Sequence, residues 1–181
     1  MAKSLRNLVV VLGDQLNLDA SALADFDPAQ DAIWMAEVME ESTHVTSSKQ
    51  RSTLFLSAMR HFAETLKSQK WPLHYTRLDD AHNAGTLADE LDKAIQTLHP
   101  QQLVMTAPGD WRVLQALQAT AKAHGKPLLL RDDLSFFTTV RDFAAHAKGR
   151  KQLRMEYWYR ELRQRFGVLM DGGKPVAKLF G

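Results

Sequence analysis

The chain has 181 residues, which corresponds to one domain at the usual size of roughly 100–200 residues. Its 45% hydrophobic residues, 24% charged residues and net charge of +2 are typical of a soluble globular protein. The absence of cysteine excludes disulfides, thiol catalysis, thiolate zinc sites and cysteine-held iron–sulfur clusters within the chain. Apolar runs such as Leu8–Leu12 are too short to span a membrane, and no signal-peptide core follows Met1–Ser4, so we expect a cytoplasmic protein.

Short apolar runs alternate with helical patterns along the chain. We predict strands over Asn7–Leu12, Asp31–Ala36, Leu73–Leu78, Gln102–Thr106 and Pro127–Leu130. We predict helices over Lys49–Lys70, Thr86–Leu98, Asp110–His124, Thr138–Ala147 and Gln152–Phe166, and a short helix within Leu18–Phe26. The glycine- and lysine-rich tail from Gly167 is expected to be frayed.

This alternation predicts an α/β fold, a Rossmann-like, doubly wound parallel sheet of five strands in the order 3-2-1-4-5, with helices on both faces. Ligands of such sheets bind beyond the carboxyl ends of the strands, where the strand order reverses. That point lies between the first and fourth strands. It is faced by Gly13-Asp14-Gln15-Leu16 and by Ala107-Pro108-Gly109-Asp110, and Glu37 borders the same edge.

These loops carry the candidate binding residues. Gly13 has no Cβ, which allows close approach of a ligand or a positive φ. Asp14 and Gln15 offer acceptors and donors for a heterocycle or a ribityl chain. The structural alternatives are a turn or helix-cap role for Asp14, a helix cap for Asp110, and a simple exposed acid for Glu37.

Motifs of several enzyme classes are missing. The first strand is not followed by G-x-G-x-x-G, and Gly172-Gly173-Lys174 is followed by Pro175, so neither a dinucleotide fingerprint nor a P-loop is present. The sequence also lacks H-E-x-x-H and G-x-S-x-G. We therefore predict no catalytic residues and no metal site, and we expect the four tryptophans to pack mainly in the core, with Trp111 at the crevice as the exception.

The charge is distributed unevenly. Residues 141–165 hold eight basic and three acidic residues, a net charge of +5, while the remainder of the chain nets −3. An anionic partner, DNA or an acidic protein surface, would explain this excess. The alternative is a solvated helix with the pairs Glu156–Arg160 and Glu161–Arg165.

Several segments together resemble the deoxyribodipyrimidine photolyase-related proteins, the family of iron–sulfur bacterial cryptochromes and prokaryotic (6-4) photolyases. The resemblance rests on segments spread from the first strand to Val176, and it is carried most specifically by Gly13–Leu16 together with Ser57–Phe62. The others are Val9–Leu12, Glu37-Val38 with Glu41, Lys49–Arg51, Pro108–Val113, Phe136-Phe137, Gly149–Lys151, Met155–Tyr157 and Tyr159-Arg160.

The resemblance implies an N-terminal antenna domain that binds 6,7-dimethyl-8-ribityllumazine. It places Gly13, Asp14, Gln15, Leu16 and Glu37 at the chromophore, with Pro108 and Gly109 lining the site. FAD and a [4Fe–4S] cluster are implied only for a helical domain that this chain lacks. We therefore expect a Rossmann-like domain over residues 1–148, and a basic linker helix and tail over residues 149–181 that lead toward that FAD domain.

Two departures from the family pattern stand out. Ser47 and Ser48 occupy positions where family members often carry a histidine pair, and residues 177–181 depart from the family sequence. Two functions are therefore considered. One is an antenna domain that serves FAD in DNA photorepair, without repair activity of its own. The other is a non-enzymatic module that binds nucleic acid or protein through residues 141–165, and the linker helix could also form a homodimer.

Overall fold

The structure is a computed structural model that describes residues 5–176. The expectations for Met1–Ser4 and for residues 177–181 of the tail lie outside the described residues. Contacts divide the chain into two compact units between Asp133 and Leu134, and each unit is described by itself. The predicted domain boundary after residue 148 stays a prediction.

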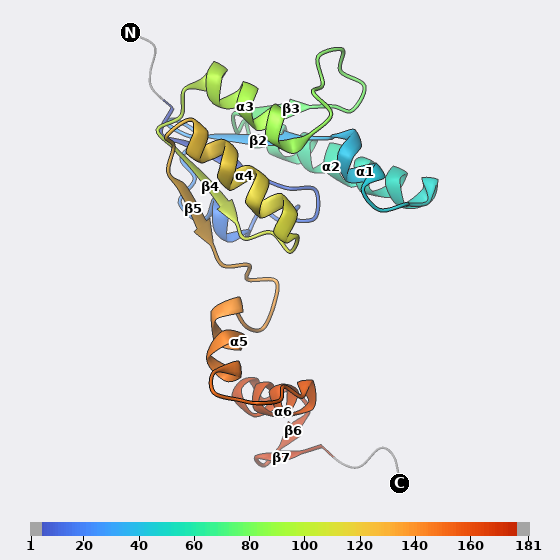
Figure 1. Cartoon of the computed structure of the whole chain (residues 1–181), viewed down its shortest axis with the longest axis vertical. Helices are drawn as coiled ribbons and strands as arrows, with labels where there is room; N and C mark the ends of the chain where they lie inside the picture. Colours follow the sequence, from blue (N-terminus) through green and yellow to red (C-terminus); the bar gives the residue numbers. More distant parts are fainter. Residues whose placement is uncertain (1–4, 177–181) are drawn as a thin grey trace. The chain divides into compact units, whose positions relative to one another are not determined.

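The first unit contains one parallel sheet in the predicted order, β3-β2-β1-β4-β5 (Figure 1). Its register places Val9 of β1 between Ile33 of β2 and Val104 of β4. The predicted α/β fold and strand order are therefore confirmed. The strands are β1 (Asn7–Val10), β2 (Ala32–Ala36), β3 (Leu73–Thr76), β4 (Gln102–Thr106) and β5 (Leu128–Arg131).

The helices of this unit begin where the sequence offers a side-chain cap. Ser48, Thr86 and Asp110 each accept a hydrogen bond from a main-chain N–H of the first turn of the helix that follows. The short helix α1 has no such cap and was not predicted. The elements are η1 (Ser21–Leu23), α1 (Met39–Thr43), α2 (Lys49–Ser68), α3 (Leu87–Leu98) and α4 (Trp111–Ala123).

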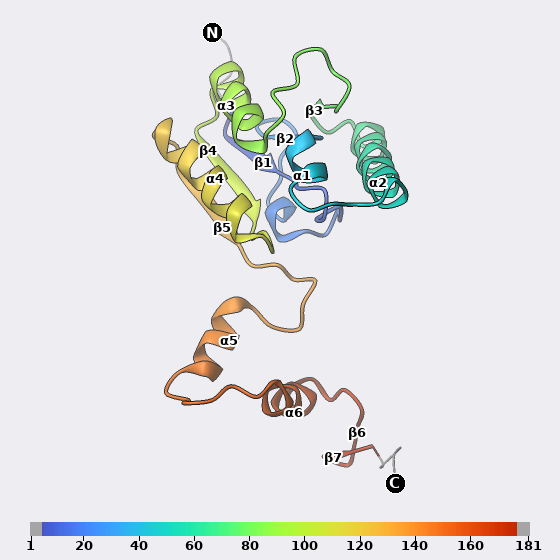
Figure 2. The same cartoon turned by 45° about the vertical axis from the view of Figure 1, so that its right-hand side comes forward.

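Each face of the sheet is covered by its own apolar core. Leu8 and Trp34 point to the face covered by α3 and α4, where Leu91 and Leu117 are buried. The residues that alternate with them, such as Val9, pack on the other face against α2 and η1. Figure 2 shows α3 and α4 on one side of the sheet and α2 on the other. The continuous apolar strands follow from burial on both faces.

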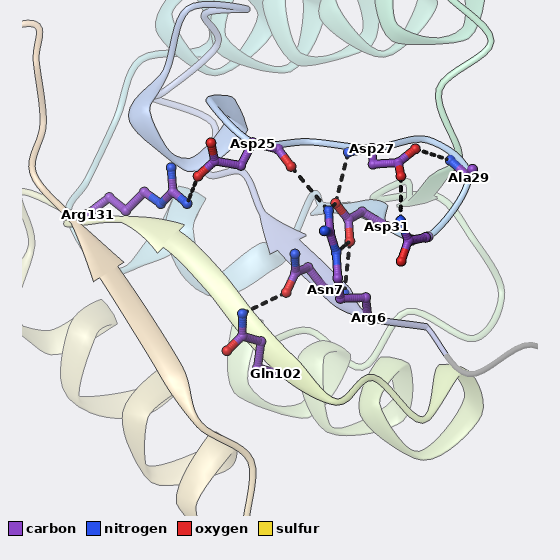
Figure 3. Close-up of polar contacts among 9 residues, drawn as sticks. Arg6, Asn7, Asp25, Asp27, Ala29, Asp31, Gln102 and Arg131 are labelled. Carbon is purple, nitrogen blue, oxygen red and sulfur yellow. Dashed lines mark hydrogen bonds and ion pairs between the residues drawn. The ribbon is translucent and has the colours of Figure 1, made fainter.

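The amino ends of β1 and β2 are joined by a buried carboxylate (Figure 3). Asp31 accepts hydrogen bonds from Arg6 Nε at 2.8 Å and Nη2 at 2.5 Å, and from the main-chain N–H groups of Asn7 and Asp27. Desolvation is the largest influence on Asp31 and raises its pKa, but these hydrogen bonds outweigh it and hold the pKa below its ordinary value. Nearby, Arg131 of β5 binds Asp25 at 2.6 Å.

The second unit contains α5 (Val140–Ala147), α6 (Met155–Phe166) and a small antiparallel hairpin, β6 (Met170–Asp171) and β7 (Lys174–Pro175). The hairpin replaces part of the expected frayed tail. Its turn uses Gly172 and Gly173 at positive φ, a conformation that glycine adopts without steric cost.

Trp158 is the buried centre of this unit, and its ring contacts His146 and Phe143 of α5. His146 Nδ1 lies 2.7 Å from Glu161, and Arg165 binds Asp142. The predicted Glu156–Arg160 pair is present at 2.5 Å. The predicted Glu161–Arg165 pair is not formed, because Glu161 and Arg165 bind His146 and Asp142 of α5 instead. Among residues 5–176, no helix is long and apolar enough to cross a membrane.

We expect Asp31→Asn to lower the free energy of unfolding by about 3 kcal/mol, because breaking a buried ion pair leaves its partner groups uncompensated. The folded-state pKa of Asp31 lies below its unfolded value, so its contribution is complete above the unfolded value and is lost as the pH falls through the folded value. Urea unfolding at pH 7 and at pH 3 measures both effects. The exposed Asp19→Asn is the charge-matched control, and an equal loss in both variants would contradict the prediction.

Candidate functional site

A pocket of about 300 Å³ opens at the carboxyl ends of β1, β2 and β4. Its walls combine the ends of these strands with α1, the loop that follows it, residues 51–59 of α2, and the first turns of α3 and α4. The whole pocket belongs to the first unit. The lining residues are Leu12, Gly13, Asp14, Ala36, Glu37, Val38, Glu41, Ser42, His44, Val45, Ser47, Arg51, Ser52, Phe55, Leu56, Met59, Leu87, Pro108, Asp110, Arg112 and Val113.

Gly13 lies in the pocket wall, in close contact with α2. A Cβ at this position would lie 2.5 Å from Phe55 Cε1 and 2.8 Å from Met59 Sδ. Gly13 does not have a positive φ, so the backbone conformation that was one expected reason for a glycine here is not found. The packing of α2 against the end of β1 requires a residue without a side chain here.

Asp14 follows in a turn closed by the hydrogen bond from the Gln15 N–H to the Leu12 carbonyl, as the structural alternative anticipated, and it also lines the pocket. Its side chain reaches solvent. Neighbouring protein atoms nevertheless desolvate the carboxylate, which raises its pKa, and Asp133, Glu41 and Asp110 add repulsion. Asp14 therefore places at the pocket edge a carboxyl group whose pKa is raised above its ordinary value.

Gln15 spans the point where the strand order reverses. Its Nε2 donates to the main-chain carbonyls of Thr106 and Ala107 at 3.3 and 3.2 Å, so the side chain joins the end of β1 to the end of β4. Gln15, Leu16 and Gly109 do not line the pocket. Leu16 packs instead against the core under α2. The pocket accordingly overlaps the predicted crevice in part and extends from it toward the end of β2.

Glu37 borders the pocket but is 1% exposed, which excludes the simple exposed acid that was the alternative. Its carboxylate accepts hydrogen bonds from Arg60 Nε and Nη2, both at 2.8 Å, from the Tyr75 hydroxyl and from the Leu78 N–H. Desolvation is the largest influence and raises the Glu37 pKa, but these donors together bring it below its ordinary value. Burial, followed by the bond to Glu37, raises the pKa of Tyr75.

Arg112 holds α1 and α4 together at the pocket. It contacts Glu41 at 2.7 Å, Glu40 at 3.3 Å and Asp110 at 3.4 Å, and Asp110 also caps α4 as predicted. Pro108 lines the same wall. The sequence did not lead us to predict Arg112 as a pocket residue, although its position two residues after the predicted crevice loop could have indicated it.

The apolar side of the pocket was not predicted either, because its residues form a pattern typical of a core stripe of α2. Phe55 is 40% exposed at the pocket, whereas Met59 on the next turn is buried. Trp111 is 71% exposed, so it lies outside the core as predicted. It does not line the pocket, however. Among residues 5–176, no cluster of three or more acidic or histidine side chains could hold a metal ion.

Comparison with known proteins gives two findings. The family profile described as deoxyribodipyrimidine photo-lyase-related protein matches residues 9–180. A curated relative, the (6-4) photolyase of Agrobacterium fabrum (strain C58), is 43% identical over 170 residues. The match covers 94% of this chain and 34% of the relative, so the chain spans about a third of the relative's length.

We expect Gly13→Ala to lower the free energy of unfolding by about 1–3 kcal/mol, because the added methyl overlaps Phe55 and Met59. In a Phe55→Ala background most of this cost should disappear, since the ring atoms nearest the new Cβ are gone. Gly109→Ala is the matched control, because its Cβ would meet nothing within 4 Å. Urea unfolding of the variants measures the coupling, and an equal cost of Gly13→Ala in both backgrounds would contradict the packing role.

Proposed function

The chain belongs to the deoxyribodipyrimidine photolyase-related protein family, and we propose that its first unit binds a ribityllumazine-like, light-harvesting chromophore. The observation that carries this proposal is the pocket at the carboxyl ends of β1, β2 and β4. Its volume of about 300 Å³ lies at the lower end of the range for small-molecule sites. The binding site of a doubly wound sheet is expected at this edge.

The chemistry of the pocket suits a flat heterocycle with a polyol chain. Phe55, Met59 and Val113 offer apolar surface for the ring system. Asp14 offers a carboxylate to hydroxyl and ring N–H donors. Arg112 has a buried Nε–H that lacks a hydrogen-bond partner among residues 5–176, and a ring carbonyl would satisfy it. Once bound, the chromophore would absorb light, and the protein would hold it in place and exclude water.

The role in a longer protein is part of the same proposal. We propose that the bound chromophore passes excitation energy to FAD on a further helical domain, in the service of DNA photorepair. FAD and a [4Fe–4S] cluster would belong to that domain, since this chain has no cysteine to hold a cluster. The antenna domain itself carries out no bond chemistry.

Titration of the purified chain with 6,7-dimethyl-8-ribityllumazine, followed by fluorescence anisotropy, tests the proposal. We expect saturable 1:1 binding. Ser52→Phe should abolish it, because Ser52 lines the pocket and the ring would fill the space of the ligand. Thr53→Phe is the matched control, since Thr53 is exposed on the same helix outside the pocket.

Circular dichroism of both variants checks that α2 is intact. A folded wild-type chain that shows no saturable binding contradicts the proposal. Binding that survives in a folded Ser52→Phe variant contradicts the location of the site.

A second candidate function concerns the second unit, which we propose binds single-stranded nucleic acid. The specific observation is that Lys148, Lys151 and Arg154 are exposed and lie within a few residues in the sequence of the exposed rings of Tyr157 and Tyr159. Cations that contact phosphates, beside rings on which bases stack, are the usual elements of single-strand binding. Part of the basic excess is used internally, since Arg160 and Arg165 pair with acids and Arg150 and Arg163 bind main-chain carbonyls.

For this candidate we expect the affinity for an oligothymidylate to fall with salt, with log Kobs linear in log salt concentration. The double variant Lys151→Ala, Arg154→Ala should reduce the slope by about 1.4, because each phosphate that is no longer neutralised accounts for about 0.7. Lys122→Ala on the exposed side of α4 is the control. A salt-independent isotherm, or an unchanged slope in the double variant, would argue against this function.

A further inference from the structure

Glu37 has no free hydrogen-bonding group with which to contact a ligand. An ionised carboxylate offers about four acceptor sites, and here four donors occupy them: two N–H groups of Arg60, the Tyr75 hydroxyl and the Leu78 N–H. The Glu37 main-chain N–H donates to the Thr76 carbonyl, and its carbonyl accepts from Asn83 Nδ2 at 2.7 Å. Its side chain has no exposed surface.

The partners of Glu37 carry two walls of the pocket. Arg60 follows Met59 on α2, the helix whose Phe55, Leu56 and Met59 line the pocket. The loop of residues 77–85 is held by the bonds from Leu78 and Asn83, and at its end Gly85 accepts a hydrogen bond from the N–H of Glu40 in α1. Glu37 thus connects both α2 and the segment that supports α1 to the end of β2, since its carboxylate binds Arg60 and the Leu78 N–H and its main-chain carbonyl binds Asn83.

Neither Arg60 nor Tyr75 lines the pocket, so an effect of substituting them cannot arise from the removal of a group that touches the ligand. We infer that Glu37 is a positioning residue of the chromophore site, which sets the pocket walls through Arg60 and the 77–85 loop and does not contact the ligand. This inference rests on the proposed function for the identity of the ligand. It differs from the role that resemblance to the family suggests, in which Glu37 lies at the chromophore itself.

The test compares Glu37→Gln and Arg60→Gln for binding of 6,7-dimethyl-8-ribityllumazine. We expect each variant to weaken binding by about tenfold, by analogy with the low end of the loss when a group that orients a metal ligand is removed. The double variant should be no weaker than the weaker single variant, because both substitutions break the same pair. The absorption maximum of the bound chromophore should equal that of the wild type, since no group that touches the ring has changed.

Glu64→Gln is the matched control, an exposed glutamate of α2 that pairs only with Lys67 among the described residues and lies outside the pocket. It should leave affinity unchanged. The inference is overturned if Glu37→Gln shifts the absorption maximum, if Arg60→Gln binds like the wild type while Glu37→Gln does not, or if the two losses add fully.

Hydrogen exchange without ligand provides a second test that is independent of the chromophore. In Glu37→Gln and Arg60→Gln we expect faster exchange confined to residues 77–85 and α1, while the amides of β1 and β4 keep wild-type protection. Unchanged exchange in the 77–85 loop would overturn the positioning role. A wild-type chain that does not bind the lumazine would contradict the proposed function alone, because the exchange result still decides what Glu37 holds in place.

Discussion

Strand β2 carries a buried carboxylate at each end, and the arrangement of the first unit depends on both. Asp31 precedes the strand and Glu37 follows it, and each is held by two hydrogen bonds from one arginine, Arg6 or Arg60. Burial of a charge is costly unless its hydrogen-bonding capacity is filled. Each carboxylate therefore requires particular donors from segments far away in the sequence. Because β2 lies between β1 and β3 and is buried on both faces, these requirements fix the loops around it as well as the strand.

The buried carboxylates at the two ends of β2 have different surroundings. At the amino end, the network around Asp31 is complete in itself and joins the segments that precede β1 and β2. At the carboxyl end, the Glu37 carboxylate and the Gln15 Nε2 group are bound by protein groups, and the space beside Glu37 remains as the pocket. The acids that build the fold are thereby separated from Asp14, whose carboxylate stays at the pocket edge. Recognition of a ligand would then depend on groups whose loss does not break the sheet.

The sequence predicted the strand order because continuous apolar strands separated by amphipathic helices leave few topologies. It also placed Gly13, Asp14, Glu37 and Pro108 at the pocket, because the carboxyl ends of parallel strands share one edge. It could not predict what these residues do there. The partners of Gln15 Nε2 lie 91 and 92 residues away, and those of the Glu37 carboxylate lie 23 to 41 residues away, so no local pattern reveals them. Likewise α1 is too short to show a helical period.

The division into two units bears on how the two proposed functions relate. Every residue that lines the pocket belongs to the first unit, and the contacts that hold α5 to α6 come from within the second. His146, Trp158 and Phe143 give the second unit a small aromatic centre, while its cations lie outside that centre. A substitution among those cations therefore removes no residue from the pocket wall. Chromophore affinity and salt-dependent affinity for nucleic acid are consequently separable properties of one chain, each assigned to the unit that contains its residues.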